Sequence, residues 1–356
     1  MTRTALVVGA SGITGRNLID HLLAIGGWEI IGLSRANARE ESNRYRHISV
    51  DITDQASSKA ALSELRDVTH IFYAARNSMP DLAAEARSNR AMLENVLVPV
   101  EAAAGSGLSH LHLMHGAKWY GSHLGAYKVP AREDDPRLPS PNFYYEQQDL
   151  AEQRQADAMS RDLGWTWSSL RPHILSGFSV GYPHNSMGVL AAYGALCREE
   201  GRPLDFPGTE ACFEAISQTT DAGLLSRAMV WCATAPEAAN EAFNIINGDY
   251  FRWMDVWPLV ADFFAVPIGE VRTQELARTM VGKDVVWDAM RARAGLQPLA
   301  IDQVATWAYG DFQWSAGWHD MSSTIKLHRH GFHEMVDTEE MIVRILGEYR
   351  ERGVIP

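Results

Sequence analysis

Tyr144 and Tyr145 stand together at the start of an expected helix, and Lys118 stands in an earlier loop. A phenol with an ammonium group nearby can act as an acid or stabilise an oxyanion beside a hydride acceptor, because the cation favours the phenolate and lowers the tyrosine pKa. The same ammonium group can donate to ribose hydroxyls. The spacing leaves two alternatives open. Lys118 could be a surface loop residue, and the two tyrosines could be an aromatic pair packed on the core.

A second chemical feature, residues 4–15 (TALVVGASGITG), predicts a pyrophosphate-binding turn. An apolar strand-like run is followed by Gly9, Gly12 and Gly15, and a helical pattern begins directly after them. In such a strand–turn–helix, one glycine makes the tight turn, one lets the backbone approach the phosphates, and one lets helix and strand pack closely. The helix N-terminus then offers free N–H groups to the anion. The alternative is a purely structural turn.

The residues after the next two strands bear on the choice of cofactor. Ser34 and Arg35 stand where an acidic residue would bind the ribose of NAD, and an arginine there can neutralise the extra phosphate of NADP. A solvated arginine is the alternative. Asp51 and Asp54 follow the third expected strand, where either could cap the next helix. Asp51 could instead contact the adenine, and the sequence leaves these two interpretations even.

The elements that must position these residues follow a regular pattern. Helical segments alternate with seven expected strands, at residues 5–8, 28–33, 46–50, 70–74, 108–114, 165–170 and 242–246. This alternation predicts an α/β fold with a doubly wound, mostly parallel Rossmann sheet, in which ligands bind at the carboxyl ends of the strands. Asn95 lies within an apolar-faced helix, and we interpret it as a satisfied core polar group rather than a proton relay.

A second lobe is expected, because residues 173–215 and 250–356 lack this alternation and are rich in Trp, Phe and Met. We predict a dinucleotide-binding Rossmann domain formed by residues 1–172 and 216–249. The remaining segments are predicted to form a smaller, mainly helical C-terminal substrate-binding lobe. The two lobes would therefore interleave in sequence.

The composition narrows the classes of partner. The chain has 356 residues, 46% of them hydrophobic, and a net charge of −12, which argues against nucleic acid as a partner. No apolar run reaches the roughly 18 residues of a membrane span, and no signal-peptide pattern precedes the first strand. Cys197, Cys212 and Cys232 lack metal or redox spacing, and the histidines match no zinc-ligand pattern. We expect a cytoplasmic protein without a metal, a membrane anchor or nucleic acid; a homodimer is allowed.

Two longer segments, HGAKWYG and EDDPRLPSPNFYYEQQD, resemble the signature of the progesterone 5β-reductase/iridoid synthase-like family. This family is an atypical, extended branch of the short-chain dehydrogenase/reductase superfamily. The resemblance covers nearly the whole chain, through GASGITG, DITD, NRAMLENVL, SSLRPHILSGFS, NEAFNIINGD and DMSSTIKLHRHGF. The superfamily usually places a lysine four positions after the tyrosine. Here Gln148 and Asp149 stand four positions after Tyr144 and Tyr145.

The resemblance implies an NADPH-dependent reductase of the activated C=C bonds of enones and enals, with NADH as a possible second cofactor. Lys118 matches the family's Lys-x-Tyr lysine and Tyr144 the first tyrosine of NFYY, so these two are the expected catalytic residues. Phe332 is an expected wall of the substrate site. Residues beside turns and strand ends are expected to contact the cofactor: Gly9, Ser11, Gly12, Ile13, Gly15, Ser34, Arg35, Asp51, Ile52, Ala75, Lys118, Tyr144, Pro172 and Ile174.

Several positions depart from the family pattern and concern the lining of the substrate site. Trp119 stands where a histidine is common, and His123-Leu124-Gly125 replaces a Pro-Phe-Glu segment. Ala75-Arg76 replaces a Thr-Trp pair near the cofactor. The expected partner is thus a small α,β-unsaturated carbonyl compound whose identity stays open.

Two rival functions remain. One is a carbonyl (1,2-) reductase or sugar-nucleotide-type enzyme on the same fold, which the lack of a lysine just after the tyrosine disfavours. The other is a non-catalytic NADP-binding sensor, which would keep the glycines and Arg35 but would not need Lys118 with Tyr144.

Overall fold

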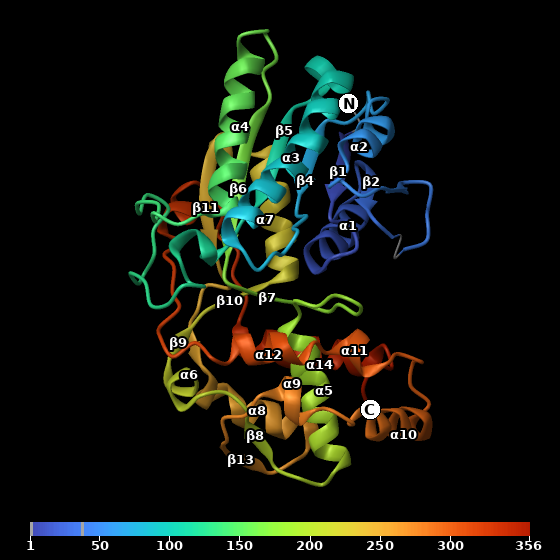
Figure 1. Ribbon diagram of the computed structural model, residues 1–356, viewed down its shortest axis with the longest axis vertical. Helices are drawn as coiled ribbons and strands as arrows, with labels where there is room; N and C mark the ends of the chain where they lie inside the picture. The colour runs from blue at the N-terminus through green and yellow to red at the C-terminus, as the bar shows by residue number, and fades with distance from the viewer. Residues whose placement is uncertain (1–2, 37–38) are drawn as a thin grey trace.

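A parallel β-sheet forms the centre of the upper half of the molecule (Figure 1). The computed structural model describes residues 3–36 and 39–356. Within them, seven strands pair in the order β3-β2-β1-β4-β5-β6-β11, and each neighbouring pair is parallel. These strands are β1 (Arg3–Val8), β2 (Trp28–Ser34), β3 (Tyr45–Ser49), β4 (His70–Tyr73), β5 (His110–Met114), β6 (Thr166–Pro172) and β11 (Glu241–Ile245). The predicted doubly wound parallel sheet is confirmed.

Strands β1 and β4 are mainly apolar because both faces of the sheet are covered, whereas β5 also carries His110 and His112. Ala5 and Leu6 of β1 and Phe72 of β4 are fully buried. In a strand that is covered on both sides, the side chains of both faces are buried, so most of its residues are hydrophobic. The chain order reverses between β1 and β4, and ligands bind at the carboxyl ends of the strands beside such a point.

Two layers of helices cover the sheet. One face carries α2 (Gln55–Leu62), α3 (Leu82–Ala104) and α4 (Phe143–Met159), which lie in contact in that order. The other face carries α1 (Ile13–Ile25), α7 (Ala222–Thr234) and α13 (Ile325–Arg329). Figure 1 shows α3 and α4 in front of the sheet and α7 behind it. Short 3-10 turns complete this half: η1 (Gly105–Gly107), η2 (Ala117–Tyr120) and η3 (Pro236–Ala238).

The lower half of the molecule is mainly helical (Figure 1). Its helices are α5 (Ser186–Glu199), α6 (Glu210–Glu214), α8 (Trp253–Phe264), α9 (Leu276–Thr279), α10 (Asp284–Ala294), α11 (Ile301–Val304), α12 (Trp307–Gln313) and α14 (Thr338–Glu351). Two-stranded sheets pair β7 (Ile174–Ser176) with β10 (Thr219–Asp221), β8 (Leu204–Phe206) with β13 (Ile268–Val271), and β9 (Ile216–Ser217) with β12 (Phe251–Arg252). In the described part of the chain, no helix combines the length and apolar character that a bilayer crossing requires.

The hydrophobic cores bear on the division into lobes, which stays a proposal. One core joins residues from 187–212 and 251–355, and two others fill the faces of the sheet. Leu327 and Phe332 belong to the sheet core on the α7 side, and the Phe332 ring lies 5.6 Å from that of Trp231. Phe332 is therefore a core residue of the Rossmann half and not the substrate-site wall that we expected. We now assign residues 325–332 to that half.

Candidate active site

The loop between β1 and α1 has the backbone that a pyrophosphate-binding turn requires. Gly9 has φ +87°, and a Cβ there would lie 2.9 Å from the Ala74 carbonyl oxygen. A Cβ on Gly15 would lie 2.3 Å from the Gly9 carbonyl oxygen, so only glycine lets α1 pack this closely on the turn. Two of the three predicted roles, the tight turn and the close helix packing, are thus assigned to Gly9 and Gly15.

The start of α1 is open to an anion. Gly12 is the N-cap residue and offers no side chain to the first amides, and the first turn holds no acidic residue. Ser11 and Ile13 flank this cap, so their backbone lies where the helix dipole and free N–H groups favour negative charge. The Tyr182 ring reaches over the turn, to 3.4 Å from where a Cβ on Gly12 would stand.

The end of β2 carries the groups expected to distinguish the two nicotinamide cofactors. Ser34 Oγ donates to the Ala36 carbonyl (2.8 Å) and lies 2.9 Å from His47 Nε2. Arg35 is exposed, and its charge reaches Asp51. A cavity of about 210 Å³ opens next to Ser34. It is lined by Ala10, Ser11, Arg16, Asn17, Ile19, Asp20, Ser34, Arg39, Tyr45, His47, Phe178, Glu348 and Arg352.

The two acidic residues after β3, Asp51 and Asp54, accept hydrogen bonds from different groups. Asp54 caps α2, because its Oδ1 accepts from the Ser57 amide at 2.6 Å. Asp51 instead accepts from the amide (3.0 Å) and hydroxyl (2.8 Å) of Thr53 and is exposed. These bonds, the amide first, lower the pKa of Asp51, and Arg35 adds to the effect. Asp51 is therefore not the cap, which leaves its carboxylate available to a ligand.

Asn95 is a satisfied core polar group, as we interpreted it. Its Nδ2 donates to the Ile52 carbonyl at 2.9 Å, so α3 fixes the backbone that follows β3. Ala75, at the neighbouring end of β4, is half-buried against the same core. Ile52 and Ala75, which are both expected to contact the cofactor, thus lie at the carboxyl edge of the sheet.

Lys118 lies in η2, directly beyond the carboxyl end of β5. In the described residues, no hydrogen bond or ion pair engages its Nζ. Burial lowers the pKa of Lys118 to about 8, with a further lowering from Arg76 and an opposing effect of Glu85. Lys118 is therefore a cation at neutral pH that titrates within the range of an ordinary assay.

Tyr144 lies in the first turn of α4, and its hydroxyl points at the backbone next to η2. A Cβ on Gly116 would lie 3.2 Å from the Tyr144 hydroxyl and 3.3 Å from the Pro172 carbonyl oxygen. Within residues 3–36 and 39–356, this hydroxyl has no hydrogen-bond partner. Burial raises the pKa of Tyr144 to about 12 against an opposing effect of Arg76, so the side chain is a neutral donor. Ile174 follows Pro172 at the start of β7.

Asn142 joins the two candidate catalytic residues. Its Oδ1 accepts from the Tyr144 amide at 3.0 Å as the cap of α4, and its Nδ2 donates to the Lys118 carbonyl at 2.8 Å. One side chain therefore fixes the backbone of both residues. Sequence reasoning did not single out Asn142, although Asn before a helical run is a usual cap signal.

Replacing Asn142 by aspartate tests this connection. The carboxylate keeps the cap acceptor but loses the donor to Lys118, so kcat should fall by about tenfold, the value of one hydrogen bond of roughly 1–1.5 kcal/mol. The measurements are kcat and the midpoint of thermal unfolding, with Asp337→Ala as control. Asp337 caps α14 through the Glu340 amide, and its loss should lower stability alone. An unchanged kcat in Asn142→Asp would show that Asn142 is only a cap.

Tyr145 has a structural place. Its hydroxyl donates to the Trp119 carbonyl at 2.6 Å and accepts from the Leu138 amide at 3.2 Å. Both of its hydrogen-bonding functions are therefore used within the fold. Of the two adjacent tyrosines, only Tyr144 keeps a hydroxyl that a substrate can engage.

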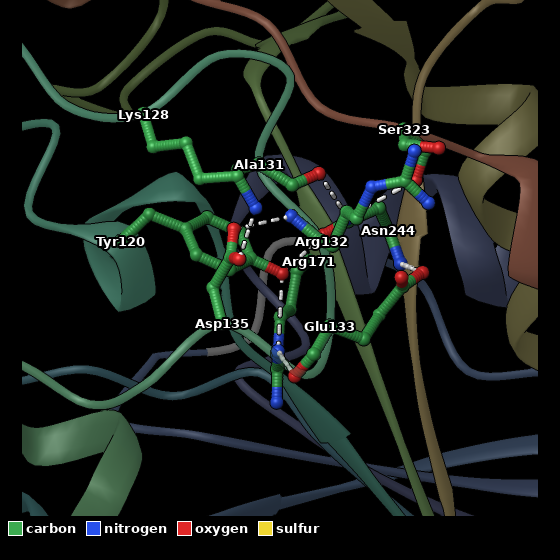
Figure 2. Close-up of polar contacts among 9 residues, drawn as sticks. All are labelled: Tyr120, Lys128, Ala131, Arg132, Glu133, Asp135, Arg171, Asn244 and Ser323. Carbon is green, nitrogen blue, oxygen red and sulfur yellow. Dashed lines mark hydrogen bonds and ion pairs between the residues drawn. The ribbon is translucent and has the colours of Figure 1, made fainter.

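A buried network of polar side chains supports η2 through Tyr120 (Figure 2). Arg171 donates from Nη1 to the Tyr120 hydroxyl (3.0 Å) and the Glu133 carbonyl (3.2 Å), and its Cζ lies 3.6 Å from the Trp119 ring centroid. Tyr120 in turn donates to Asn244 Oδ1 at 2.6 Å. Sequence reasoning missed Arg171 and Asn244. Their only signal was membership of the segments SSLRPHILSGFS and NEAFNIINGD.

Asn244 closes this network across the molecule. Its Nδ2 donates to the carbonyls of Ala131 (3.2 Å) and Ser323 (3.1 Å), and its amide donates to Glu133 Oε1 at 2.8 Å. The loop between η2 and α4 is thus tied to β11 and to the segment before α13 (Figure 2). A buried network of this kind restricts the conformation of the residues it holds, although Arg171 Nε has no partner among the described residues.

The chain is similar to known proteins over nearly its whole length. The family model of the PRISE-like Rossmann-fold domain matches residues 49–327. The (S)-8-oxocitronellyl enol synthase of Camptotheca acuminata is 32% identical, over 99% of this chain and 93% of that protein. The 3-oxo-Δ(4,5)-steroid 5-beta-reductase of Arabidopsis thaliana is 30% identical, over 99% of this chain and 93% of that protein.

Solved structures share the fold at lower identity. The Bordetella bronchiseptica enzyme WbmH, in complex with NAD⁺, matches with a TM-score of 0.65 and 17% identity over 99% of this chain and 100% of that one. The UDP-glucose 4-epimerase of Thermotoga maritima, with UDP-glucose, matches with a TM-score of 0.66 and 15% identity over 98% of this chain and 99% of that one. At these identities the likeness concerns the fold alone.

Proposed function

This chain belongs to the PRISE-like Rossmann-fold family, the progesterone 5β-reductase/iridoid synthase-like family that the sequence resembles, and we propose that it is an NADPH-dependent reductase of activated C=C bonds. The substrates would be α,β-unsaturated ketones or aldehydes, reduced in the 1,4-sense. One observation carries the proposal. Lys118 and Tyr144 are joined through Asn142 at the carboxyl edge of the sheet, and both reactive groups are free of protein partners in the described residues.

The residues present fit a nicotinamide dinucleotide. The uncapped start of α1 suits a pyrophosphate, and the exposed Asp51 suits the adenosine end. Lys118 would hold the nicotinamide ribose, with Pro172 and Ile174 beside it. When bound, NADPH supplies a hydride from C4 of its nicotinamide to the β-carbon of the substrate.

The chain's own residues would manage the charge that develops on the substrate oxygen. Tyr144 would donate a hydrogen bond from its hydroxyl to this enolate oxygen, and it is available as a donor at neutral pH because it stays protonated. Lys118 would add a positive charge nearby and position the ribose. Asn142 would keep the two at a fixed separation, which holds the reacting atoms in line. Solvent would protonate the α-carbon.

The position of the transferred hydride tests this function. With 4-deuterated NADPH and a panel of enals and enones, we expect saturated carbonyl products that carry deuterium at the β-carbon, measured by NMR and mass spectrometry. Allylic alcohols with deuterium at the carbonyl carbon would establish the carbonyl-reductase alternative. Tight NADPH binding without oxidation across the panel would favour the sensor.

The preference for NADPH is a separate proposal that depends on Arg35. A guanidinium at the end of β2 suits the 2′-phosphate, and no acidic residue directly follows that strand. Arg35→Ala should raise the KM for NADPH about 10–100-fold, the value of a charge-assisted hydrogen bond of roughly 1.5–3 kcal/mol, with a much smaller change for NADH.

The matched control for Arg35→Ala is Arg46→Ala. Arg46 is an exposed residue of β3, so its loss changes the net charge equally and should affect both cofactors alike. Equal effects of Arg35→Ala on NADPH and NADH would show that Arg35 is not the ligand of the 2′-phosphate.

A further inference from the structure

Arg76 places a second positive charge beside the candidate catalytic residues. It follows the carboxyl end of β4, and its Nε (3.1 Å) and Nη2 (2.7 Å) donate to Glu85 Oε1. The Glu85 side chain is 4% exposed, whereas that of Arg76 is 28% exposed. Arg76 Cζ lies 5.2 Å from the ring centroid of Phe143, the neighbour of Tyr144. The guanidinium therefore lies between a buried carboxylate and the start of α4, with part of it open to solvent.

The backbone next to Arg76 is held rigidly. Asn89 of α3 accepts from the Asn77 amide and donates to the Asn77 carbonyl, each at 2.8 Å. Asn77 Nδ2 also donates to Ser88 Oγ at 3.0 Å. The backbone amide, the backbone carbonyl and the side-chain amide of Asn77 are thus all bonded to α3. A guanidinium on such a support, with Glu85 fixing its orientation, is preorganised for a ligand.

The charge of Arg76 contributes to the pKa values of many groups around the candidate active site. After burial, which is the larger effect in each case, Arg76 lowers the pKa of Lys118, and it opposes the raised pKa of Tyr144. The aromatic and imidazole groups that respond to it come from distant segments of the chain: His123, Tyr182, His184 and Tyr309. The rings of three of these residues are neighbours, with centroids 5.8 Å apart for Tyr182 and His184 and 5.3 Å apart for His184 and Tyr309.

The charges at this place do not cancel. Burial lowers the pKa values of His123 and His184 to about 4, so both are neutral at neutral pH. Arg76 and Lys118 are cationic and Glu85 is the carboxylate paired with one of them. Nη1 of Arg76 has no protein partner in residues 3–36 and 39–356. A planar guanidinium with a free N–H edge, partly shielded from water, is suited to bind a carboxylate.

We propose that Arg76 binds a carboxylate of the substrate, so that the preferred substrates are acidic α,β-unsaturated carbonyl compounds. The proposal rests on the function proposed above and specifies its substrate class. Tyr144 and Lys118 would take the carbonyl oxygen, and Arg76 would take a carboxylate carried on another part of the same molecule. Arg76 is then a specificity-determining residue, separate from the groups that act on the reacting atoms.

The experiment compares acidic substrates with their uncharged forms. Cyclohexenones and enals that carry a carboxylate on alkyl arms of increasing length are assayed with NADPH, each beside its methyl ester. For the best arm length, the wild-type protein should show a kcat/KM for the acid about 10–100-fold above that for the ester. Arg76→Gln should reduce this ratio to near one, and Arg76→Lys, which keeps the charge but not the fork, should reduce it part-way.

Arg87→Gln is the matched control variant. Arg87 lies on the exposed side of α3, so its removal changes the net charge by the same amount and should leave the acid-to-ester ratio as in the wild type. The binding of saturated keto acids and their esters to the NADPH complex, followed by calorimetry, gives the same comparison without turnover. It also applies if Arg76→Gln fails to fold.

The outcomes separate this inference from the proposed function. If esters and acids are reduced alike by the wild type, or if Arg76→Gln and Arg76→Lys retain the preference for acids, Arg76 is not a carboxylate site while the reductase function stands. If no unsaturated carbonyl compound, acidic or neutral, is reduced, the proposed function itself is wrong.

Discussion

Replacing Tyr144 by phenylalanine should lower kcat by about 10²–10³-fold, the effect of removing one oxyanion donor from a preorganised site. The change removes the hydroxyl and keeps the ring, which lies 4.9 Å from His115 and 4.1 Å from Phe143 between ring centroids. Folding and NADPH affinity should therefore survive. Steady-state kinetics with an enone, together with a fluorescence titration of NADPH, measure both quantities.

Tyr145→Phe is the matched control, since it removes the same atom from the adjacent residue. Among the described residues, its hydroxyl bonds to two backbone groups, the carbonyl of Trp119 and the amide of Leu138. The free energy of unfolding should fall by about 1 kcal/mol, with a small effect on kcat. The opposite ranking, with the larger kcat loss in Tyr145→Phe, would assign the chemistry to Tyr145.

Lys118→Met should lower kcat by about 10²-fold and raise the KM for NADPH in the same variant, because Lys118 is assigned to both the enolate charge and the ribose. The pH profile identifies the group. Lys118 has a pKa lowered to about 8 and is charged below that value, so wild-type kcat/KM should fall as the pH rises through about 8.

Two variants test that assignment of the pH limb. In Lys118→Met, kcat/KM should no longer fall as the pH rises through about 8. Lys118→Arg, which stays protonated, should retain partial activity and show its fall in kcat/KM above the pH range of the assay. Tyr144 cannot produce the limb, because burial raises its pKa to about 12. A limb near pH 8 that persists in Lys118→Arg would belong to another group and would contradict the role given to Lys118.

In the proposed mechanism the lysine does not need to follow the tyrosine closely in the sequence. In this chain α4 carries Tyr144 and η2 carries Lys118, and the two elements meet at the carboxyl edge of the sheet. Asn142 bonds to Lys118 and Tyr144, and Tyr145 of α4 also donates to the Trp119 carbonyl of η2. The Arg171–Asn244 network supports η2 through Tyr120 (Figure 2). The geometry of the pair therefore depends on the fold of the loop as much as on the two residues.

The sequence alone determined the parts of this protein that depend on neighbouring residues. The seven strands of the main sheet were predicted within a few residues of their observed bounds, because most of them contain short apolar runs that the sheet buries. The turn at Gly9 and the close packing at Gly15 followed from backbone requirements that only glycine meets. The family was likewise readable from contiguous segments, and the match over residues 49–327 confirms it.

Only the tertiary structure decided the features that join distant parts of the chain. Asp54 and not Asp51 caps α2, Asn142 connects Lys118 to Tyr144, and Phe332 packs behind the sheet. The ion pair of Arg76 with Glu85 is another such feature, because the sequence around neither residue indicates its partner. Periodicity and turn chemistry are local properties, whereas these contacts arise from how the sheet brings loop ends together, and their energies depend on burial that no local segment sets.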